Sequence, residues 1–286
     1  MSSYREFVAG SFRFALGNKT LVMGIVNVTP DSFSDGGEVF DPMLAVERAL
    51  QQIRDGADII DVGGESTRPG SDPLPLEEEL RRVLPVIERL AMNPGICISI
   101  DTYKATVAEQ ALKAGASIVN DISAGGFDPE MPSVVRRAHA GVILMHIKGT
   151  PRNMQVDPQY DDVVEEVAGF LGKAVGKFLR AGVKFDHITV DPGIGFGKRL
   201  NHNLELTRNL HRLSGLATGV VYGPSRKSFI GALTDRPAKE RLAGTLGAVA
   251  AGVMSGADIV RVHDVRETVD MLKVLDSVMA SRTIPA

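Results

Sequence analysis

Eight short apolar segments of this chain each end in a polar or charged side chain. In chain order, the terminal groups are Asn27, Asp61, Asp101, Asn120, His146, Asp191, the run Ser225, Arg226 and Lys227, and finally Arg261 with His263. If the segments are parallel strands of one barrel, their carboxyl ends meet at a single face, where such barrels bind their ligands. Solubility or helix capping would explain one or two such groups, so eight of them predict a ligand-binding site.

Two kinds of chemistry are present among these strand ends. Asp101, Asn120 and Asp191 offer carboxylate and amide acceptors, which suit a flat heterocycle with adjacent N–H donors. The other kind is cationic and follows the last two segments, where barrels commonly bind phosphate; it comprises Lys227, Arg261 and His263. Charge-assisted hydrogen bonds from such groups stabilise an anionic leaving group. We therefore expect acceptors for a donor-rich ring on one side of the mouth and cations for an anion on the other.

Glycine-rich loops follow three of the segments. They contain residues 36–37 (GG), 63–64 (GG) and 193–197 (GIGFG). The third loop lacks the GxGxxG spacing of a dinucleotide site, and we interpret its glycines as allowing the backbone to approach a flat ligand closely. Residues 29–38 and 65–74 form long loops rich in Pro, Gly and Ser, and such loops can act as lids over a site. Plain solvated connections are the alternative interpretation.

The apolar segments themselves predict parallel strands. They are rich in β-branched residues and nearly continuous, as strands covered on their outer face must be, and an amphipathic segment follows each one. The predicted strands are residues 21–28, 58–62, 96–100, 117–119, 142–145, 187–190, 219–222 and 258–262. Eight such units favour an α/β fold of the closed (β/α)8 or TIM-barrel type, whereas six would favour an open doubly wound sheet. No linker or change of composition divides residues 1–286, so we expect a single domain.

Smaller features support this arrangement. Residues 12–14 (FRF) and 17–18 (GN) resemble a short N-terminal β-hairpin, which we expect to close the floor of the barrel. Acidic residues near 161–166 and basic residues near 173–180 predict a helix that ends before Gly182, because this order complements the helix dipole. Pro85 lies inside another predicted helix and should bend it.

Composition argues against several classes of function. The net charge of −3 provides no basic field for nucleic acid, and no HExxH spacing indicates a zinc site. The longest uncharged stretch, residues 242–257, has 16 residues and four glycines, so we expect a buried, closely packed helix and no membrane partner. The single Cys97 cannot form an internal disulfide, which fits a cytoplasmic protein, and its isoleucine neighbours indicate a passive strand residue. The first ten residues contain no apolar core typical of a secretory signal.

At the strand ends the sequence resembles the bacterial-type dihydropteroate synthases, a family of pterin-binding enzymes. Seven segments carry the resemblance in the family's order: residues 27–37 (NVTPDSFSDGG), 61–70 (DVGGESTRPG), 99–102 (SIDT), 120–122 (NDI), 191–193 (DPG), 225–229 (SRKSF) and 261–265 (RVHDV). Any one of these segments is a weak signal. Seven in order, within a resemblance that extends from about residue 23 to residue 269, are a strong one.

The resemblance implies a role for each matching residue. For the pterin ring the implied contacts are Asp101, Asn120, Met145, Asp191, Phe196, Lys227 and Arg261, the last of which can also stack on the ring. For p-aminobenzoate they are Phe33, Thr67, Arg68, Pro69, Lys227 and Ser228. For diphosphate they are Asn27, Arg261 and His263, and Asn27 is also the implied Mg²⁺ ligand. The implied catalytic residues are Asp35, Asp101, Asp191, Lys227, Arg261 and His263, with Asp35 contributed by the closed first loop.

The implied reaction joins 6-hydroxymethyl-7,8-dihydropterin diphosphate to p-aminobenzoate and yields 7,8-dihydropteroate and diphosphate in folate biosynthesis. We expect a dissociative, SN1-like displacement, in which cations stabilise the departing diphosphate while Asp101 and Asp191 stabilise the cationic pterin. The neutral arylamine then attacks in a site that the loops close to water. The resemblance also implies Mg²⁺ as cofactor, a homodimer formed through the last helices, and sulfonamides as inhibitors.

Alternative functions share the barrel. A pterin-binding methyltransferase module would pass a methyl group to a corrinoid, but no corrinoid-binding domain is recognisable here, and such a module has no use for the anion site. A non-catalytic pterin-binding paralogue is the second alternative, and the intact loops argue against it. An aldolase-type barrel would need a Schiff-base lysine within a strand, and no predicted strand contains one.

Two strand-end residues have open interpretations. Asp61 either takes part in the ligand site or serves only to position the loop that follows its strand or to pair with a neighbouring cation. His146 either belongs to the site or is a buried histidine with satisfied hydrogen bonds, and we favour the latter.

Overall fold

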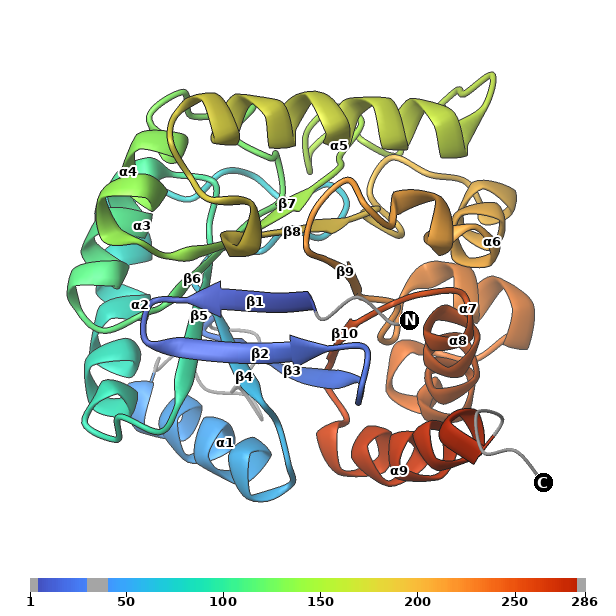
Figure 1. Cartoon of the computed structure of the whole chain (residues 1–286), viewed down its shortest axis with the longest axis horizontal. Helices are drawn as coiled ribbons and strands as arrows, with labels where there is room; N and C mark the ends of the chain where they lie inside the picture. Colours follow the sequence, from blue (N-terminus) through green and yellow to red (C-terminus); the bar gives the residue numbers. More distant parts are fainter. Residues whose placement is uncertain (1–4, 30–40, 282–286) are drawn as a thin grey trace.

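The computed structural model describes residues 5–29 and 41–281, and this part of the chain forms a closed barrel of eight parallel strands (Figure 1). The strands are β3 (Leu21–Asn27), β4 (Ile59–Gly63), β5 (Cys97–Asp101), β6 (Ile118–Asp121), β7 (Gly141–Met145), β8 (Ile188–Asp191), β9 (Gly219–Tyr222) and β10 (Ile259–Val262). They pair in chain order, and β10 closes the barrel against β3. The predicted (β/α)8 barrel is confirmed, with each predicted strand placed within two residues of the observed one.

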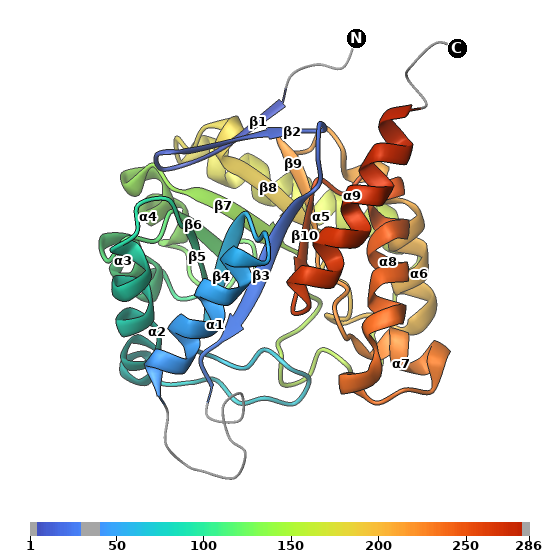
Figure 2. The same cartoon turned by 90° about the horizontal axis from the view of Figure 1, so that it is seen from below.

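Helices follow every strand and surround the barrel (Figures 1 and 2). The α-helices are α1 (Pro42–Arg54), α2 (Leu76–Ala91), α3 (Ala105–Lys113), α4 (Met131–Ala138), α5 (Val163–Arg180), α6 (Leu200–Arg208), α7 (Ser228–Thr234), α8 (Leu242–Met254) and α9 (Val265–Ser281). Short 3-10 turns are η2 (Phe185–His187), η3 (Leu210–Leu213) and η4 (Ala238–Glu240). As predicted, acidic groups begin α5, where the Asp162 side chain caps two backbone N–H groups, and basic groups end it.

The N-terminal hairpin closes one end of the barrel. Strands β1 (Arg5–Ala9) and β2 (Phe12–Leu16) pair antiparallel, and Figure 2 shows them across the end opposite to the loops that follow β4 and β7. Phe7 is fully buried and joins the interior cluster that includes Met23, Ile118 and Ile259. The hairpin is therefore confirmed as a floor, although it begins earlier than residue 12 and turns at Gly10.

Burial was predicted for Cys97 and for the helix within residues 242–257, and the two predictions have different outcomes. Cys97 is buried inside the barrel, and burial raises the pKa of its thiol to about 12, so it packs as an apolar side chain. The helix expected within residues 242–257 is only partly buried. In α8, Gly252 lies so close to the Tyr222 ring that an added Cβ would come within 2.5 Å of it, whereas Met254 is 58% exposed. Within the part of the chain described, no helix combines the length and apolar character needed to cross a membrane.

We expect Phe7→Ala to lower the free energy of unfolding by about 3–5 kcal/mol, because it removes a buried aromatic ring and leaves a cavity in the barrel floor. Urea denaturation followed by circular dichroism measures this loss. Phe185→Ala, at a side chain that is 46% exposed, is the control and should have a much smaller effect. Equal losses in the two variants would contradict the role of Phe7.

Candidate active site

The carboxyl ends of the strands form one narrow cleft. Its walls are Thr67, Asp101, Asn120, Ile122, Met145, Asp191, Phe196, Gly223, Lys227 and Arg261. All the residues expected to contact a pterin are therefore in one place, although they come from six different parts of the barrel. Ile122 and Gly223 were missed, because an apolar residue or a glycine after a strand has no chemical signature in the sequence.

A buried guanidinium holds the acidic side of the cleft together. Arg261 on β10 donates from Nε to Asp61 Oδ2 and from Nη2 to Asp101 Oδ2, at 2.6 Å in each case. Asn120 donates its amide N–H to the same oxygen of Asp61 at 3.1 Å. Asp61 is fully buried, so among its interpretations the structure supports pairing with a neighbouring cation. The expected separation of acceptors from cations is wrong for Arg261, which lies between the carboxylates.

Two carboxylate oxygens in this cluster still lack a donor among the described residues. They are Asp61 Oδ1 and Asp101 Oδ1, and both are fully buried. Burial, opposed by Arg261, raises the pKa of Asp101 to about 7. A buried acceptor without a partner costs about 1–3 kcal/mol, so a ligand that brings N–H donors to Asp101 would relieve this cost.

The opposite wall contains a second carboxylate, Asp191, and the partly buried ammonium of Lys227. Asp191 Oδ1 accepts the backbone N–H of Gly193 at 2.6 Å, and Lys227 donates to the carbonyl of Ile194. The ammonium also lies 4.7 Å from the centre of the Phe196 ring. Burial lowers the pKa of Lys227 to about 8, and the Asp191 carboxylate opposes this shift.

The glycines of residues 193–197 serve the protein's own packing. A Cβ at Gly193 would lie 1.9 Å from the carbonyl oxygen of His146, and one at Gly195 would lie 3.2 Å from Lys227 Cδ. Both glycines have positive φ, at +68° and +82°. The close approach predicted for this loop is present, but it is an approach to neighbouring protein atoms.

The anion side of the mouth contains His263 and Ser225. The backbone N–H of His263 donates to Ser225 Oγ at 3.1 Å, and that hydroxyl lies 2.9 Å from the ring Nδ1. Burial, together with the nearby guanidinium of Arg261, lowers the pKa of His263 to about 3, so the ring is neutral. If the hydroxyl donates to Nδ1, the ring proton is on Nε2, where it can be donated to an anion.

His146 and Lys198 form a buried pair next to the wall that contains Asp191 and Phe196. Lys198 is 3% exposed, and its ammonium lies 2.9 Å from His146 Nδ1 and 3.0 Å from the carbonyl of Phe196. Burial lowers the pKa of both groups, for His146 to about 2. His146 is thus a buried histidine with a hydrogen-bond partner, as favoured from the sequence, while Lys198 was missed because lysines are common on surfaces.

The remaining predicted residues lie around the rim. Thr67 lines the cleft, but Arg68, Pro69 and Ser228 are exposed and do not. Asn27 is the last residue of β3. Phe33 and Asp35 lie outside the described residues.

The cleft is narrow in this conformation, and the guanidinium of Arg261 reaches across its acidic wall to Asp61 and Asp101.

Comparison with known proteins shows which family this chain resembles. The model of the pterin binding enzymes matches residues 23–263. Dihydropteroate synthase of Synechocystis sp. is 46% identical over 269 residues, which cover 94% of this chain and 93% of that protein. The Bacillus subtilis dihydropteroate synthase is 47% identical over 261 residues, covering 91% of this chain and 89% of that protein.

Solved structures agree with the sequence relatives. Xanthomonas albilineans dihydropteroate synthase with 4-aminobenzoic acid has a TM-score of 0.90 at 41% identity, covering 99% of this chain and 100% of that one. The Burkholderia cenocepacia enzyme complexed with 7,8-dihydropteroate has a TM-score of 0.88 at 41% identity, with 98% of each chain covered. The Yersinia pestis enzyme in a sulfonamide drug complex has a TM-score of 0.91 at 38% identity, covering 96% and 99%.

We expect the affinity of the cleft for a pterin to depend on pH with a maximum. Asp101 accepts ring donors only when ionised, so affinity falls by about tenfold per unit as the pH drops below about 7. Lys227 interacts as an ammonium, so affinity also falls as the pH rises above about 8. Titration calorimetry with 6-hydroxymethylpterin measures both limbs. Asp101→Asn should bind weakly and lose the acidic limb; an unchanged acidic limb in that variant would contradict the assignment.

Proposed function

Proceeding from the fact that this chain belongs to the dihydropteroate synthases of the pterin-binding enzyme family, we propose how its cleft performs the reaction. The chain is a transferase that condenses a dihydropterin diphosphate with p-aminobenzoate to form 7,8-dihydropteroate in folate synthesis. One observation carries the assignment of residues: the seven side chains expected at the pterin ring line a single cleft. We propose that residues 1–286 act together as one domain.

Asp101 and Asp191 bind the donor edge of the pterin from opposite walls. Asp191 is buried and the side chain of Asp101 is 11% exposed, and Asp101 has an oxygen with no protein donor among the described residues. On binding, Arg261 withdraws from Asp101 and stacks on the face of the ring. Asn120 remains on Asp61, while Met145 and Phe196 contact the ring through apolar surface.

The bond between the pterin methylene carbon and the diphosphate oxygen breaks first. Positive charge then spreads over the pterin, and the carboxylates of Asp101 and Asp191 attract it more strongly than they attract the neutral ring. The arylamine of p-aminobenzoate attacks the methylene carbon, forms the C–N bond and releases its proton to solvent. Lys227 lies beside both substrates, next to Asp191 and Phe196. Phe33, Thr67, Arg68, Pro69 and Ser228 surround p-aminobenzoate, and Asp35 belongs to the closed first loop.

Asn27, Arg261 and His263 hold the diphosphate at the junction of β3 and β10, which are paired neighbours. Among the described residues no three His, Cys, Asp or Glu side chains gather as a metal site, and Asn27, at the end of β3, would supply an amide oxygen to Mg²⁺. This fits Mg²⁺, which commonly takes one or two protein oxygens together with substrate phosphates and water. When bound, Mg²⁺ would neutralise charge on the departing diphosphate.

Neither alternative function is favoured. Relatives at 46% and 47% identity over most of the chain are dihydropteroate synthases, and the strand-end residues of their family are present here. We also propose that sulfonamides bind where p-aminobenzoate does, as the Yersinia pestis complex suggests. The single cysteine, buried as a thiol, supports a reducing cytoplasm as the location.

We propose a homodimer formed through α8 and α9. Helix α8 is apolar on every side, yet one face is exposed along Ala243, Gly247, Ala251 and Met254. On neighbouring α9, Val274 is 67% exposed and Val278 is 51% exposed. Exposed apolar side chains on two neighbouring helices are typical of an interface.

Lys227→Ala should retain the fold but lose about a hundredfold or more in turnover, because its charge contacts both substrates. Release of diphosphate that depends on p-aminobenzoate is the assay, and thermal unfolding checks the fold. Lys239→Ala, on an exposed turn, is the control. Near-normal condensation by Lys227→Ala would refute the placement of this residue.

Met254→Asp should convert the dimer to a monomer, since a carboxylate in an apolar interface is strongly disfavoured. Light scattering after gel filtration measures the mass against the chain mass of 30.6 kDa. Met92→Asp, at a residue 73% exposed after α2, should leave the mass unchanged. A wild-type protein that already has the monomer mass would exclude the proposed dimer.

A further inference from the structure

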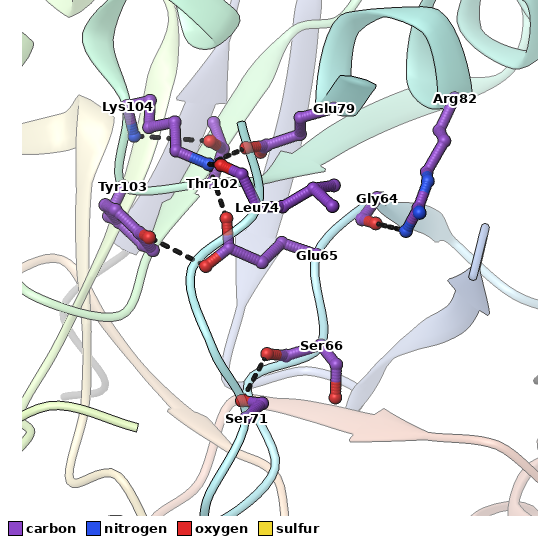
Figure 3. Close-up of polar contacts among 10 residues, drawn as sticks. All are labelled: Gly64, Glu65, Ser66, Ser71, Leu74, Glu79, Arg82, Thr102, Tyr103 and Lys104. Carbon is purple, nitrogen blue, oxygen red and sulfur yellow. Dashed lines mark hydrogen bonds and ion pairs between the residues drawn. The ribbon is translucent and has the colours of Figure 1, made fainter. Parts of the chain in front are cut away.

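A buried ion cluster lies behind the loop after β4, outside the cleft (Figure 3). We call residues 65–74 loop two. The ammonium of Lys104 contacts the carboxylates of Glu65 and Glu79 and donates to the carbonyl of Leu74 at 2.7 Å. The side chains are 18%, 6% and 1% exposed for Lys104, Glu65 and Glu79, so three charges are largely removed from water.

The position of these partners in the sequence is the informative feature. Glu65 is the first residue of loop two and Leu74 is its last, so one ammonium binds both ends of the loop. Glu79, on α2, and Lys104, at the start of α3, belong to the rigid outer layer. Lys104 thereby ties the loop to two helices at once.

Further contacts transmit this anchoring to the centre of the loop. The Ser71 hydroxyl lies within hydrogen-bond distance of the carbonyls of Ser66 and Arg68, at 2.6 and 2.7 Å, so the two halves of the loop are joined internally. The N–H of Gly70 donates to the carbonyl of Pro151 at 2.9 Å, which joins the tip to the loop after β7. Thr67, which lines the cleft, lies within this braced segment.

A second set of contacts joins the cluster to the wall of the cleft that contains Asp101, Ile122 and Met145, which we call the pterin wall. Tyr103 donates its hydroxyl to Glu65 Oε1 at 2.7 Å. Its ring stacks edge-on against Phe127 and packs against the apolar group that contains Ile122 and Met145. Tyr103 and Lys104 follow Asp101 by two and three residues in the sequence, so a short segment joins the pterin wall to the cluster that holds loop two.

Burial of charge on this scale costs free energy that apolar side chains would avoid. Burial raises the pKa of Glu79, the Glu65 charge adds to this effect, and Lys104 opposes it. Without the ammonium, two buried carboxylates would face each other and the loop end would lose its donor. The cluster is therefore suited to hold loop two in one conformation. Apolar packing, which is not directional, would allow the loop several conformations.

We propose that Lys104 is a positioning residue for p-aminobenzoate: by binding both ends of loop two, it holds Thr67 and Arg68 where the second substrate enters. This inference rests on the proposed role of loop two in binding that substrate. Lys104 does not line the cleft, so this role is one of positioning.

Lys104→Met tests the proposal by removing the charge while keeping a chain of similar length. The KM for p-aminobenzoate should rise by about tenfold to a hundredfold, because a small misplacement of a binding group has effects of this size. The KM for the pterin diphosphate should change far less. Hydrogen–deuterium exchange of peptides covering residues 65–74 should become faster.

Two companion variants keep the test decisive. Lys104→Met combined with Glu79→Gln keeps the net charge of the cluster and should show the same changes even if the single variant folds poorly. Lys113→Met lies on the same helix and removes an exposed ion pair to Glu109, 3.6 Å long, so it should alter neither KM nor exchange.

The outcomes separate this inference from the function beneath it. Unchanged exchange in loop two, or an equal rise in both KM values, would overturn the role of Lys104. Faster exchange with an unchanged KM for p-aminobenzoate would show that Lys104 holds the loop but that loop two does not position the substrate. Absence of condensation by the wild-type protein would refute the proposed function, while the exchange measurement would still test the clamp.

Discussion

The guanidinium of Arg261 between two buried carboxylates is the interaction on which the cleft depends. Its partners, Asp61 and Asp101, lie on β4 and β5, and the contact exists because closure of the barrel brings β10 beside β3 and so close to both strands. Neither carboxylate could remain ionised at low cost without this cation. These ion pairs stabilise the acidic wall, and in the proposed function the wall binds the ring after Arg261 leaves Asp101.

This arrangement separates the tasks of the site among different parts of the fold. The barrel strands hold Asp101, Asn120 and Asp191 rigidly, since the backbones of the first two are paired on both sides and that of Asp191 is paired with β7. Such rigidity suits a flat ring whose donors must meet fixed acceptors. In the proposed function, loops bind the second substrate. Loops have no strand partners, so other contacts must hold them in place. The buried cluster around Lys104 is the support that this structure provides for loop two.

Burial controls the charge of several groups here and thereby their chemistry. It raises the pKa of Asp101 and lowers those of Lys227 and His263, so all three lie closer to neutrality than they would in water. A site of weakly solvated groups responds strongly when charge develops on a substrate. In the proposed mechanism the departing diphosphate and the cationic pterin are such charges.

The sequence alone determined the barrel, because eight apolar segments with polar ends and intervening amphipathic helices have few other ways to bury their surfaces. It also determined which side chains would meet, since strand ends converge whatever the loops do. The sequence did not determine which charged side chains pair. Asp61 and Arg261 are 200 residues apart, and a lysine such as Lys104 is a residue type usually found on the surface. Only the tertiary structure decides such contacts. The free energy of a buried charge depends on the groups within a few ångströms of it, and those groups come from strands and loops that are distant in the sequence.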